Sequence, residues 1–335
     1  KLLKMKLKPF AKLPGSLDAP KKIAANKLLA SMLIVFSLFI SHASVSAEES
    51  SPYLYILGVV QDAGFPQTGC YAEHCMPAWE NSLLRRGATS VALIDPSTEQ
   101  KFIFEATPNF PDQLYQLQAE ASDDRFDLAG VFLTHAHIGH YAGLMFLGHE
   151  AMGASSVPVY AMPRMESFLR SNGPWSQLVA FQNIELHSLT DGVGEEFDGL
   201  RITPFLVPHR DEFSETVGYK IQGPSKSAIF IPDINKWSDW EESIVELIRT
   251  VDYALIDATF FDDKELPGRD MSQIPHPFVS ESLELFQEFS AEERNKVWFI
   301  HMNHTNPLLD PSSEQSKTVK AEGYNIATEG LRLRL

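Results

Sequence analysis

The chain has 335 residues and carries 44 acidic against 28 basic side chains, a formal net charge of −16. This length accommodates one large domain or two small ones. Residues 1–27 hold eight lysines and one acid, a net of +7, whereas residues 48–335 hold 20 basic and 43 acidic side chains, a net of −23. An acidic body argues against nucleic acid or an anionic membrane as a partner, because contact with phosphate needs a basic surface. We therefore expect a small-molecule substrate and no nucleic-acid partner.

The first 47 residues are typical of an export signal. Lys21, Lys22 and Lys27 precede an apolar run at 28–40, and small residues follow up to Ala47. We expect residues 1–47 to be a signal peptide with an extended basic n-region, cleaved after Ala47. The apolar core of about 13 residues is short for a membrane span, although an uncleaved anchor is the alternative. The prediction is a periplasmic or secreted protein without stable membrane association, with residues 48–335 as a single catalytic domain.

Helices and strands alternate along the body, and no linker-like composition divides it. Apolar runs predict strands, in chain order, at 54–60, 91–95, 101–105, 131–133, 157–160, 200–207, 217–221, 228–231, 253–256, 297–300 and 331–335. Helices are predicted at 111–120, 141–148, 165–171, 237–249 and 280–289. Two sheets packed face to face with outer helices, an α+β class, fit this order. The polar stretch 261–277, which contains His276, is either a flap over a site or an ordinary surface loop.

Three histidines follow the apolar run 128–133 within six residues: His135, His137 and His140. His135 and His137 lie two apart, so they share a face while the chain stays extended. His140 would join them from the turn that opens a helix. Neutral imidazole suits zinc, iron, copper and nickel. The cluster therefore predicts a metal site at the end of a strand.

Other polar residues also follow buried apolar runs. His209 follows 202–207, Asp233 follows 228–231, Asp257 ends 253–256 and His301 ends 297–300. A sheet edge can gather such side chains from distant parts of the sequence into one pocket. Each residue alone is more typical of a solvated loop, but together they favour one shared metal site.

These residues resemble the metallo-β-lactamase-fold hydrolase superfamily over residues 53–335. The resemblance implies an αββα four-layer sandwich. It implies one metal site of His135, His137 and His209, and a second of His140 and His301, with Asp233 as the bridging carboxylate. The motif's usual aspartate, which binds the second metal, is Gly139 here. Asp62, in the loop after the first strand, is the candidate replacement.

A narrower resemblance is to the pyrroloquinoline quinone biosynthesis protein B branch, carried by segments 57–70, 255–262 and 299–307. It implies iron-dependent oxidation. The metal-clip cysteines of that branch are only partly matched by Cys70 and Cys75. Because an export leader is foreign to a cytosolic biosynthetic protein, we expect a relative of that branch rather than the biosynthetic protein itself.

The two cysteines leave two alternatives open. In an oxidising compartment Cys70 and Cys75 favour a disulfide. Together with His74 they could instead form a metal clip, which would still need a fourth ligand for tetrahedral zinc.

The leading interpretation is an exported hydrolase that holds one or two zinc ions. A three-histidine site leaves zinc an open position, where bound water has a pKa near ~7 and supplies hydroxide. That nucleophile would attack an ester, lactone, amide or phosphodiester bond. Asp233 would orient the water, while Asp257 would hold a histidine or the neighbouring loop. His304 would act as a general acid, bind substrate, or make only a supporting hydrogen bond to a ligand.

Two other classes of function remain open. His140, His301 and Asp233 form a two-histidine, one-carboxylate set that also suits a non-haem iron oxygenase. A non-catalytic periplasmic protein that binds a metal or small molecule is the third. No Gly-x-Ser-x-Gly elbow occurs, so a serine nucleophile is disfavoured.

Overall fold

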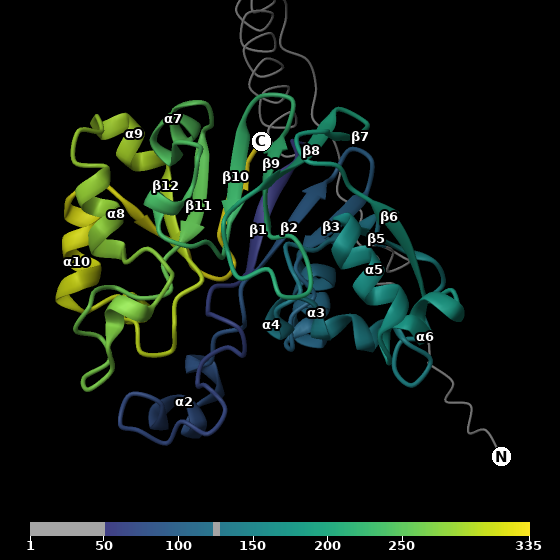
Figure 1. The fold of residues 1–335 in the computed structure, drawn as a ribbon, viewed down its shortest axis with the longest axis horizontal. Helices are drawn as coiled ribbons and strands as arrows, with labels where there is room; N and C mark the ends of the chain where they lie inside the picture. The colour runs from purple at the N-terminus through teal and green to yellow at the C-terminus, as the bar shows by residue number, and fades with distance from the viewer. Residues whose placement is uncertain (1–50, 123–127) are drawn as a thin grey trace, which may run out of the picture. The chain divides into compact units, whose positions relative to one another are not determined.

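Two mixed β-sheets pack against one another across a shared apolar core in a computed structural model that describes residues 51–122 and 128–335 (Figure 1). Within these residues each sheet has seven strands. The first sheet has the order β14 (Arg332–Arg334), β1 (Tyr53–Gly58), β2 (Ser90–Asp95), β3 (Gln100–Phe104), β4 (Gly130–Phe132), β5 (Val157–Ala161), β6 (Ile184–Ser188). The second has the order β13 (Asn325–Ile326), β12 (Val297–Ile300), β11 (Tyr253–Asp257), β10 (Ser227–Ile231), β9 (Val217–Gln222), β8 (Leu200–Leu206), β7 (Glu195–Phe197).

Each sheet is antiparallel in one half and parallel in the other. Strands β14, β1, β2 and β3 pair antiparallel, and β3 to β6 pair parallel. In the second sheet β7 to β10 pair antiparallel and β10 to β13 pair parallel. The carboxyl ends of parallel neighbours meet at one edge of a sheet. Residues that follow β10, β11 and β12 are therefore brought together.

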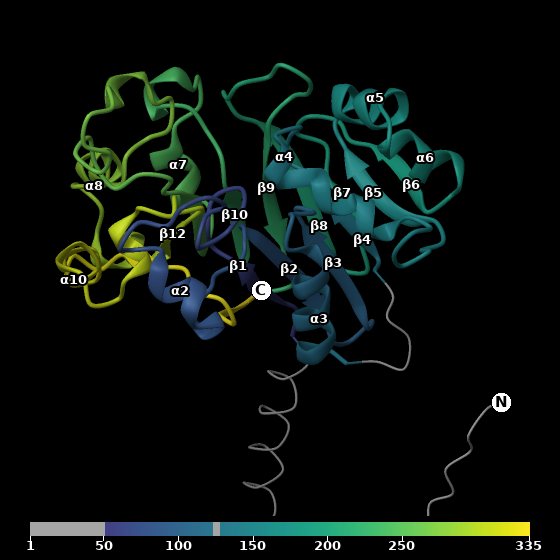
Figure 2. The same ribbon diagram turned by 90° about the horizontal axis from the view of Figure 1, so that it is seen from below.

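Helices cover the outer face of each sheet. On the side of the first sheet lie α3 (Phe110–Glu120), α4 (Ile138–Tyr141), α5 (Pro163–Ser171) and α6 (Trp175–Ala180) (Figures 1 and 2). On the side of the second lie α7 (Ile244–Arg249), α8 (Val279–Leu285), α9 (Ala291–Lys296) and α10 (Glu314–Ala321). A short helix, α2 (Met76–Glu80), projects from the loop after β1. The predicted αββα sandwich is confirmed.

Side chains alternate along the strands of the first sheet, so apolar residues lie on both of its faces. Ile103 and Val131 face the helices, whereas Phe104 and Phe132 face the second sheet. There the Phe104 ring lies 5.3 Å from the ring of Tyr219, which is completely buried. Aromatic packing between the sheets thus holds β3 and β9 against one another.

Two predicted helices differ from the structure. The range 141–148 begins earlier, as α4, and continues as a 3₁₀ helix over Ala142–Leu147. The Gly143 N–H is hydrogen-bonded to the Ala106 carbonyl at 2.8 Å, so it cannot continue an α-helical ladder. The range 237–249 breaks because Ser243 caps α7, accepting a hydrogen bond from the Glu246 N–H.

The leader lies outside the described residues, so the boundary after Ala47, the signal peptide and the single domain over 48–335 stay predictions. Among the described residues, no helix has the length and apolarity needed to cross a bilayer.

Candidate metal centre

Strand ends deliver the predicted ligands to one edge of the sandwich. His135 follows β4 by three residues, and His301 directly follows β12. His137 has extended backbone and precedes α4, which carries His140. His209 follows β8, and Asp233 lies two residues beyond β10. These residues form two overlapping groups rather than scattered loop positions.

The first group contains His135, His137, His209 and Asp233. His137 Nδ1 lies 2.7 Å from His135 Nε2 and 3.3 Å from His209 Nε2. Asp233 Oδ2 lies 3.3 Å from both of those Nε2 atoms. Asp233 is only 4% exposed, so this convergence occurs away from water. Three ring nitrogens and a carboxylate oxygen aimed at one point are a suitable ligand set for a divalent metal.

The second group contains Asp62, His140 and His301. His140 Nε2 lies 3.3 Å from Asp62 Oδ1 and 3.6 Å from Asp233 Oδ2. His301 is fully buried, and its Nε2 makes no hydrogen bond to any described residue. A buried ring nitrogen without a partner is costly unless a ligand completes it. Asp233 also groups with Asp257 and His301, so it lies between the two histidine groups.

A second set of polar side chains orients the imidazole rings by contacting their other nitrogen. This is how metal-ligating histidines are held in most proteins. The contacts are Thr134 Oγ1 to His135 Nδ1 at 2.9 Å, Glu105 Oε2 to His140 Nδ1 at 3.4 Å, Asn235 Oδ1 to His209 Nδ1 at 3.2 Å, and Thr259 Oγ1 to His301 Nδ1 at 3.0 Å. In each of these four rings the Nε2 atom is left to face the centre.

Burial and neighbouring charge set the protonation of this centre. Burial, with the charge on His140, holds the pKa of His135 well below its ordinary value, which keeps the ring neutral and able to bind a metal. Burial raises the pKa of Asp233, but the charges on His209 and His276 outweigh it and hold that pKa well below the usual range. Burial also raises the pKa of Glu105. The neutral ring established here is that of His135, beside an ionised Asp233; burial lowers the pKa of His140, but Glu105 and Asp62 outweigh it and raise that pKa well above its ordinary value.

His276 is a site residue that the sequence analysis did not assign. Its Nδ1 lies 2.8 Å from Asp257 Oδ2 and 3.1 Å from Asp233 Oδ1. Burial lowers the pKa of His276, but the charges of Asp257 and Asp233 outweigh it and raise that pKa to about 9. The only signal in the sequence was a histidine inside the polar stretch 261–277, because no apolar strand precedes it.

Asp257 has the supporting role predicted for it. Besides His276, it accepts hydrogen bonds from the Ile234 and Thr259 N–H groups and from the Thr259 hydroxyl. The Thr259 hydroxyl in turn contacts His301. Asp257 thus connects the loops that follow β10 and β11 to a ligand after β12.

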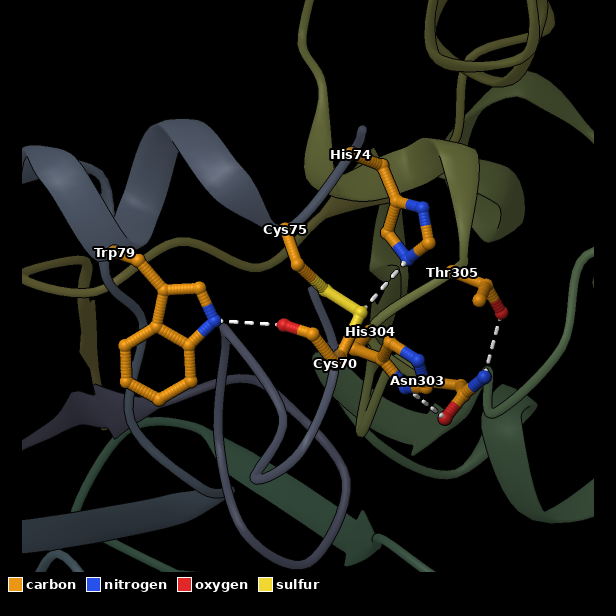
Figure 3. The surroundings of a disulfide bond; sticks show 7 residues. All are labelled: Cys70, His74, Cys75, Trp79, Asn303, His304 and Thr305. Carbon is orange, nitrogen blue, oxygen red and sulfur yellow. Dashed lines mark hydrogen bonds between the residues drawn. A yellow bond between two sulfur atoms is a disulfide. The ribbon is translucent and has the colours of Figure 1, made fainter. Parts of the chain in front are cut away.

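His304 lies in a different cluster, with Cys70, His74 and Cys75 (Figure 3). Cys70 and Cys75 form a disulfide, so of the two alternatives for these cysteines the structure contains the disulfide. His74 Nε2 lies 3.6 Å from Cys70 Sγ, and the His74 and His304 rings stack with centroids 5.5 Å apart. The structure does not bring His304 into either ligand group. Its catalytic role stays a prediction.

Comparisons with known proteins show the family and the fold. The family described as a beta-lactamase superfamily domain matches residues 92–302. Coenzyme PQQ synthesis protein B of Methylobacterium sp. (strain 4-46) is 26% identical over 305 residues, which cover 84% of this chain and 99% of that protein. The same protein of Methylorubrum extorquens (strain PA1) is 24% identical over 84% of this chain and all of its own length.

Solved structures show the same fold. Zn²⁺-bound PqqB from Methylobacterium extorquens has a TM-score of 0.70 at 24% identity, covering 84% of this chain and 100% of its own. A diphosphatase from the PhnP family has a TM-score of 0.59 at 21% identity, covering 85% and 97%. The fold, the strand-end histidines and the family match agree: the chain belongs to the β-lactamase superfamily and, within it, resembles coenzyme PQQ synthesis protein B.

Proposed function

We propose that this protein is a metal-dependent hydrolase, with zinc as its metal. The observation that carries the proposal is the convergence of five histidines on Asp233. A single oxygen of Asp233, Oδ2, lies within 3.3–4.0 Å of ring nitrogens of four of them. His135, His137 and His209 would hold one ion. His140 and His301 would hold a second, with Asp233 between them.

The residues present fit such ions. Imidazole nitrogen with carboxylate oxygen is a zinc ligand set, and the rings are already oriented from behind. A bound cation would give the unpartnered Nε2 of His301 a partner, and it would offset the close approach of His137 Nδ1 to two other ring nitrogens. The zinc bound by the similar PqqB supports this choice of metal. When bound, zinc supplies a Lewis acid and lowers the pKa of a coordinated water.

The residues of the chain supply the orientation. Asp233 Oδ2 faces the histidines, and Asp233 Oδ1 contacts His276, so the carboxylate is fixed at both oxygens. From that position Asp233 can orient a water and accept its proton. Asp257 Oδ2 contacts the same nitrogen, His276 Nδ1, at 2.8 Å, which holds the imidazole beside both carboxylates.

The substrate class is an ester, lactone, amide or phosphodiester. Structural neighbours named as a diphosphatase and as human tRNase Z, the latter at a TM-score of 0.52, make phosphoesters the first compounds to test. The net charge of −23 over residues 48–335 favours a small substrate over an anionic polymer.

Export to the periplasm or outside the cell is part of the proposal. The Cys70–Cys75 disulfide supports it, because disulfides persist in oxidising compartments. Amino-terminal sequencing of protein recovered from the periplasm or medium tests it. A start at Glu48 is expected, and an intact residue 1–47 segment on protein in the cytosol would contradict export.

The hydrolase proposal is tested by assaying chromogenic phosphodiesters, esters and lactones before and after removal of metal with a chelator. We expect turnover that is lost on chelation and restored by zinc. Parallel assays of Asp233→Asn, which keeps the shape of the side chain, should show loss of rate in the zinc-loaded protein. Turnover that survives both changes would contradict the proposal, and zinc binding without turnover would favour a non-catalytic binding protein.

An iron-dependent oxygenase is the second candidate. Asp62, His140 and His301 form a two-histidine, one-carboxylate group, which is the ligand set of non-haem iron oxygenases. The similarity to PQQ synthesis protein B also favours it. Protein purified without air with iron bound, and oxygen consumption that depends on that iron, would support this candidate over hydrolysis.

A further inference from the structure

We propose that Asp62 supplies the carboxylate ligand of the second ion, occupying the space that Gly139 leaves free. The inference rests on the proposed function, since it needs a metal between His140 and His301. It adds that Asp62 and a side chain at residue 139 would occupy the same volume. An aspartate from the loop after β1 takes the place of the aspartate that the motif has at residue 139.

The first argument is steric. A Cβ atom built on Gly139 would lie 2.6 Å from both Cα and Oδ1 of Asp62, and 2.9 Å from its Cβ. Real carbon atoms do not approach backbone so closely, so no other residue fits at 139 while Asp62 keeps its position. The Asp62 side chain therefore fills the volume next to His140 that a side chain at 139 would occupy.

The second argument is the direction of the carboxylate. Asp62 Oδ1 lies 3.3 Å from His140 Nε2, and one oxygen of Asp62 lies within 4.8 Å of ring nitrogens of both His140 and His301. The other nitrogen of His140 already faces Glu105, at 3.4 Å. Since Glu105 orients His140 from behind, Asp62 is on the side where the unpartnered Nε2 of His301 also points.

The third argument is that the backbone fixes this loop against the His301 loop. The Gln61 N–H donates to the Met302 carbonyl and the Met302 N–H donates to the Val59 carbonyl, each at 2.9 Å. Asp62 itself has a φ of +42°, in the left-handed region that residues other than glycine seldom adopt. Such conformations persist where the surroundings impose them, and they concentrate at functional sites.

The test is zinc stoichiometry and affinity, measured by elemental analysis and by competition with a chromophoric chelator. The variants are Asp62→Gly, Asp62→Asn, Gly139→Asp and the double variant Asp62→Gly/Gly139→Asp. Asp198→Gly is the matched control, because Asp198 has the same φ of +42° but is exposed in the turn between β7 and β8. It isolates the backbone effect of replacing such an aspartate with glycine.

We expect about two zinc ions per chain in the unchanged protein and in Asp198→Gly, and about one in Asp62→Gly. Asp62→Asn should keep the fold and lower the affinity for the second zinc ion by about tenfold or more. The double variant should regain the second ion, because its carboxylate enters the vacated space from residue 139. Gly139→Asp alone should lose the second ion through the steric conflict with Asp62.

Two zinc ions of unchanged affinity in Asp62→Gly would overturn the inference and leave the hydrolase proposal standing. One zinc ion in both the unchanged protein and Asp62→Gly would also overturn the inference without contradicting the hydrolase proposal. A double variant that stays at one ion would contradict the exchange of positions. Absence of any zinc from the unchanged protein would instead contradict the proposed function itself.

Discussion

The histidines of the metal centre differ in which ring nitrogen faces the centre. His135, His140, His209 and His301 contact a supporting side chain through Nδ1, whereas His137 presents Nδ1 to the centre and its Nε2 lies 3.3 Å from Glu212. His137 is thus the most exposed of the five histidines, and its Nδ1 makes the shortest contact between two of the rings.

His137→Ala removes the nitrogen that two other ligands approach, so the first ion should be lost and the hydrolytic rate should fall about a thousandfold or more. Zinc content by elemental analysis measures this directly. His149→Ala is the control, since His149 is exposed and belongs to neither ligand group. Full zinc content in His137→Ala would show that the first site is wrongly assigned.

At this scale the sequence predicts much of the candidate site. The spacing from His135 to His140 and the strand-end positions of His209, Asp233 and His301 are local signals. Glu105 and His276 were missed. Glu105 ends the predicted strand 101–105 but has no other ligand-type residue near it in the sequence, and no apolar strand precedes His276. Their contacts with His140 and Asp233 exist only after distant segments pack together.

Among the elements, β4 and β9 hold the histidine segment between the sheets. The Tyr219 hydroxyl donates to the Leu133 carbonyl, and the Val217 N–H donates to the Thr134 carbonyl at 3.2 Å. Both bonds end at the residues just before His135. They connect the two sheets at the point from which the ligands emerge.

Tyr219→Phe removes one of these bonds and leaves a buried carbonyl without that donor. The free energy of unfolding should fall by about 1–2 kcal/mol. Zinc content should be unchanged, because no ligand is altered. Urea unfolding followed by circular dichroism measures the loss, with Tyr115→Phe as control on the exposed face of α3. Equal stability of the two variants would contradict this role of Tyr219.

The loop that carries His276 should give a pH-dependent stability in the metal-free protein. The pKa of His276 is raised from 6.5 to about 9 in the folded chain by Asp257 and Asp233. The folded state therefore binds the proton more tightly, and the stabilisation is complete below about pH 6.5 and lost as pH rises through about 9.

This stabilisation is on the order of 3 kcal/mol. Comparing the unfolding free energy of the chelator-treated protein with that of His276→Gln across pH 6–10 measures it. The difference between the two proteins should shrink as pH rises. A difference that stays constant across this range would show that His276 is neutral in the folded chain.

Predicted elements are most accurate where an apolar run is buried on both faces, as in β10, β11 and β12. The strands β6, β7 and β13 and the helices α2, α6, α9 and α10 were not predicted. None exceeds eight residues, which is too short for a clear periodic pattern.

For the whole molecule, the alternation of strands and helices predicts two sheets, but the pairing order could not be read from it. β14, the last strand, pairs with β1, the first described strand, and this contact joins opposite ends of the described chain. Long-range pairing of this kind has no local signal, because β14 joins the edge of the first sheet beside β1 only after the rest of the chain has folded.

The number of free thiols tests the state of the cysteine cluster in the intact protein. A disulfide between Cys70 and Cys75, the only cysteines in the sequence, leaves none. Thiol titration of denatured, unreduced protein should therefore give a value near zero. Two reactive thiols together with an additional zinc would contradict the disulfide and favour a metal clip with His74 and His304.

The most direct test of the central claim is elemental analysis of protein purified without air or chelator. We predict about two zinc ions per chain, bound by the histidines that surround Asp233. Iron in place of zinc would favour the iron-dependent oxygenase over the hydrolase. Absence of any bound metal would contradict the assignment of this centre and the hydrolase function built on it.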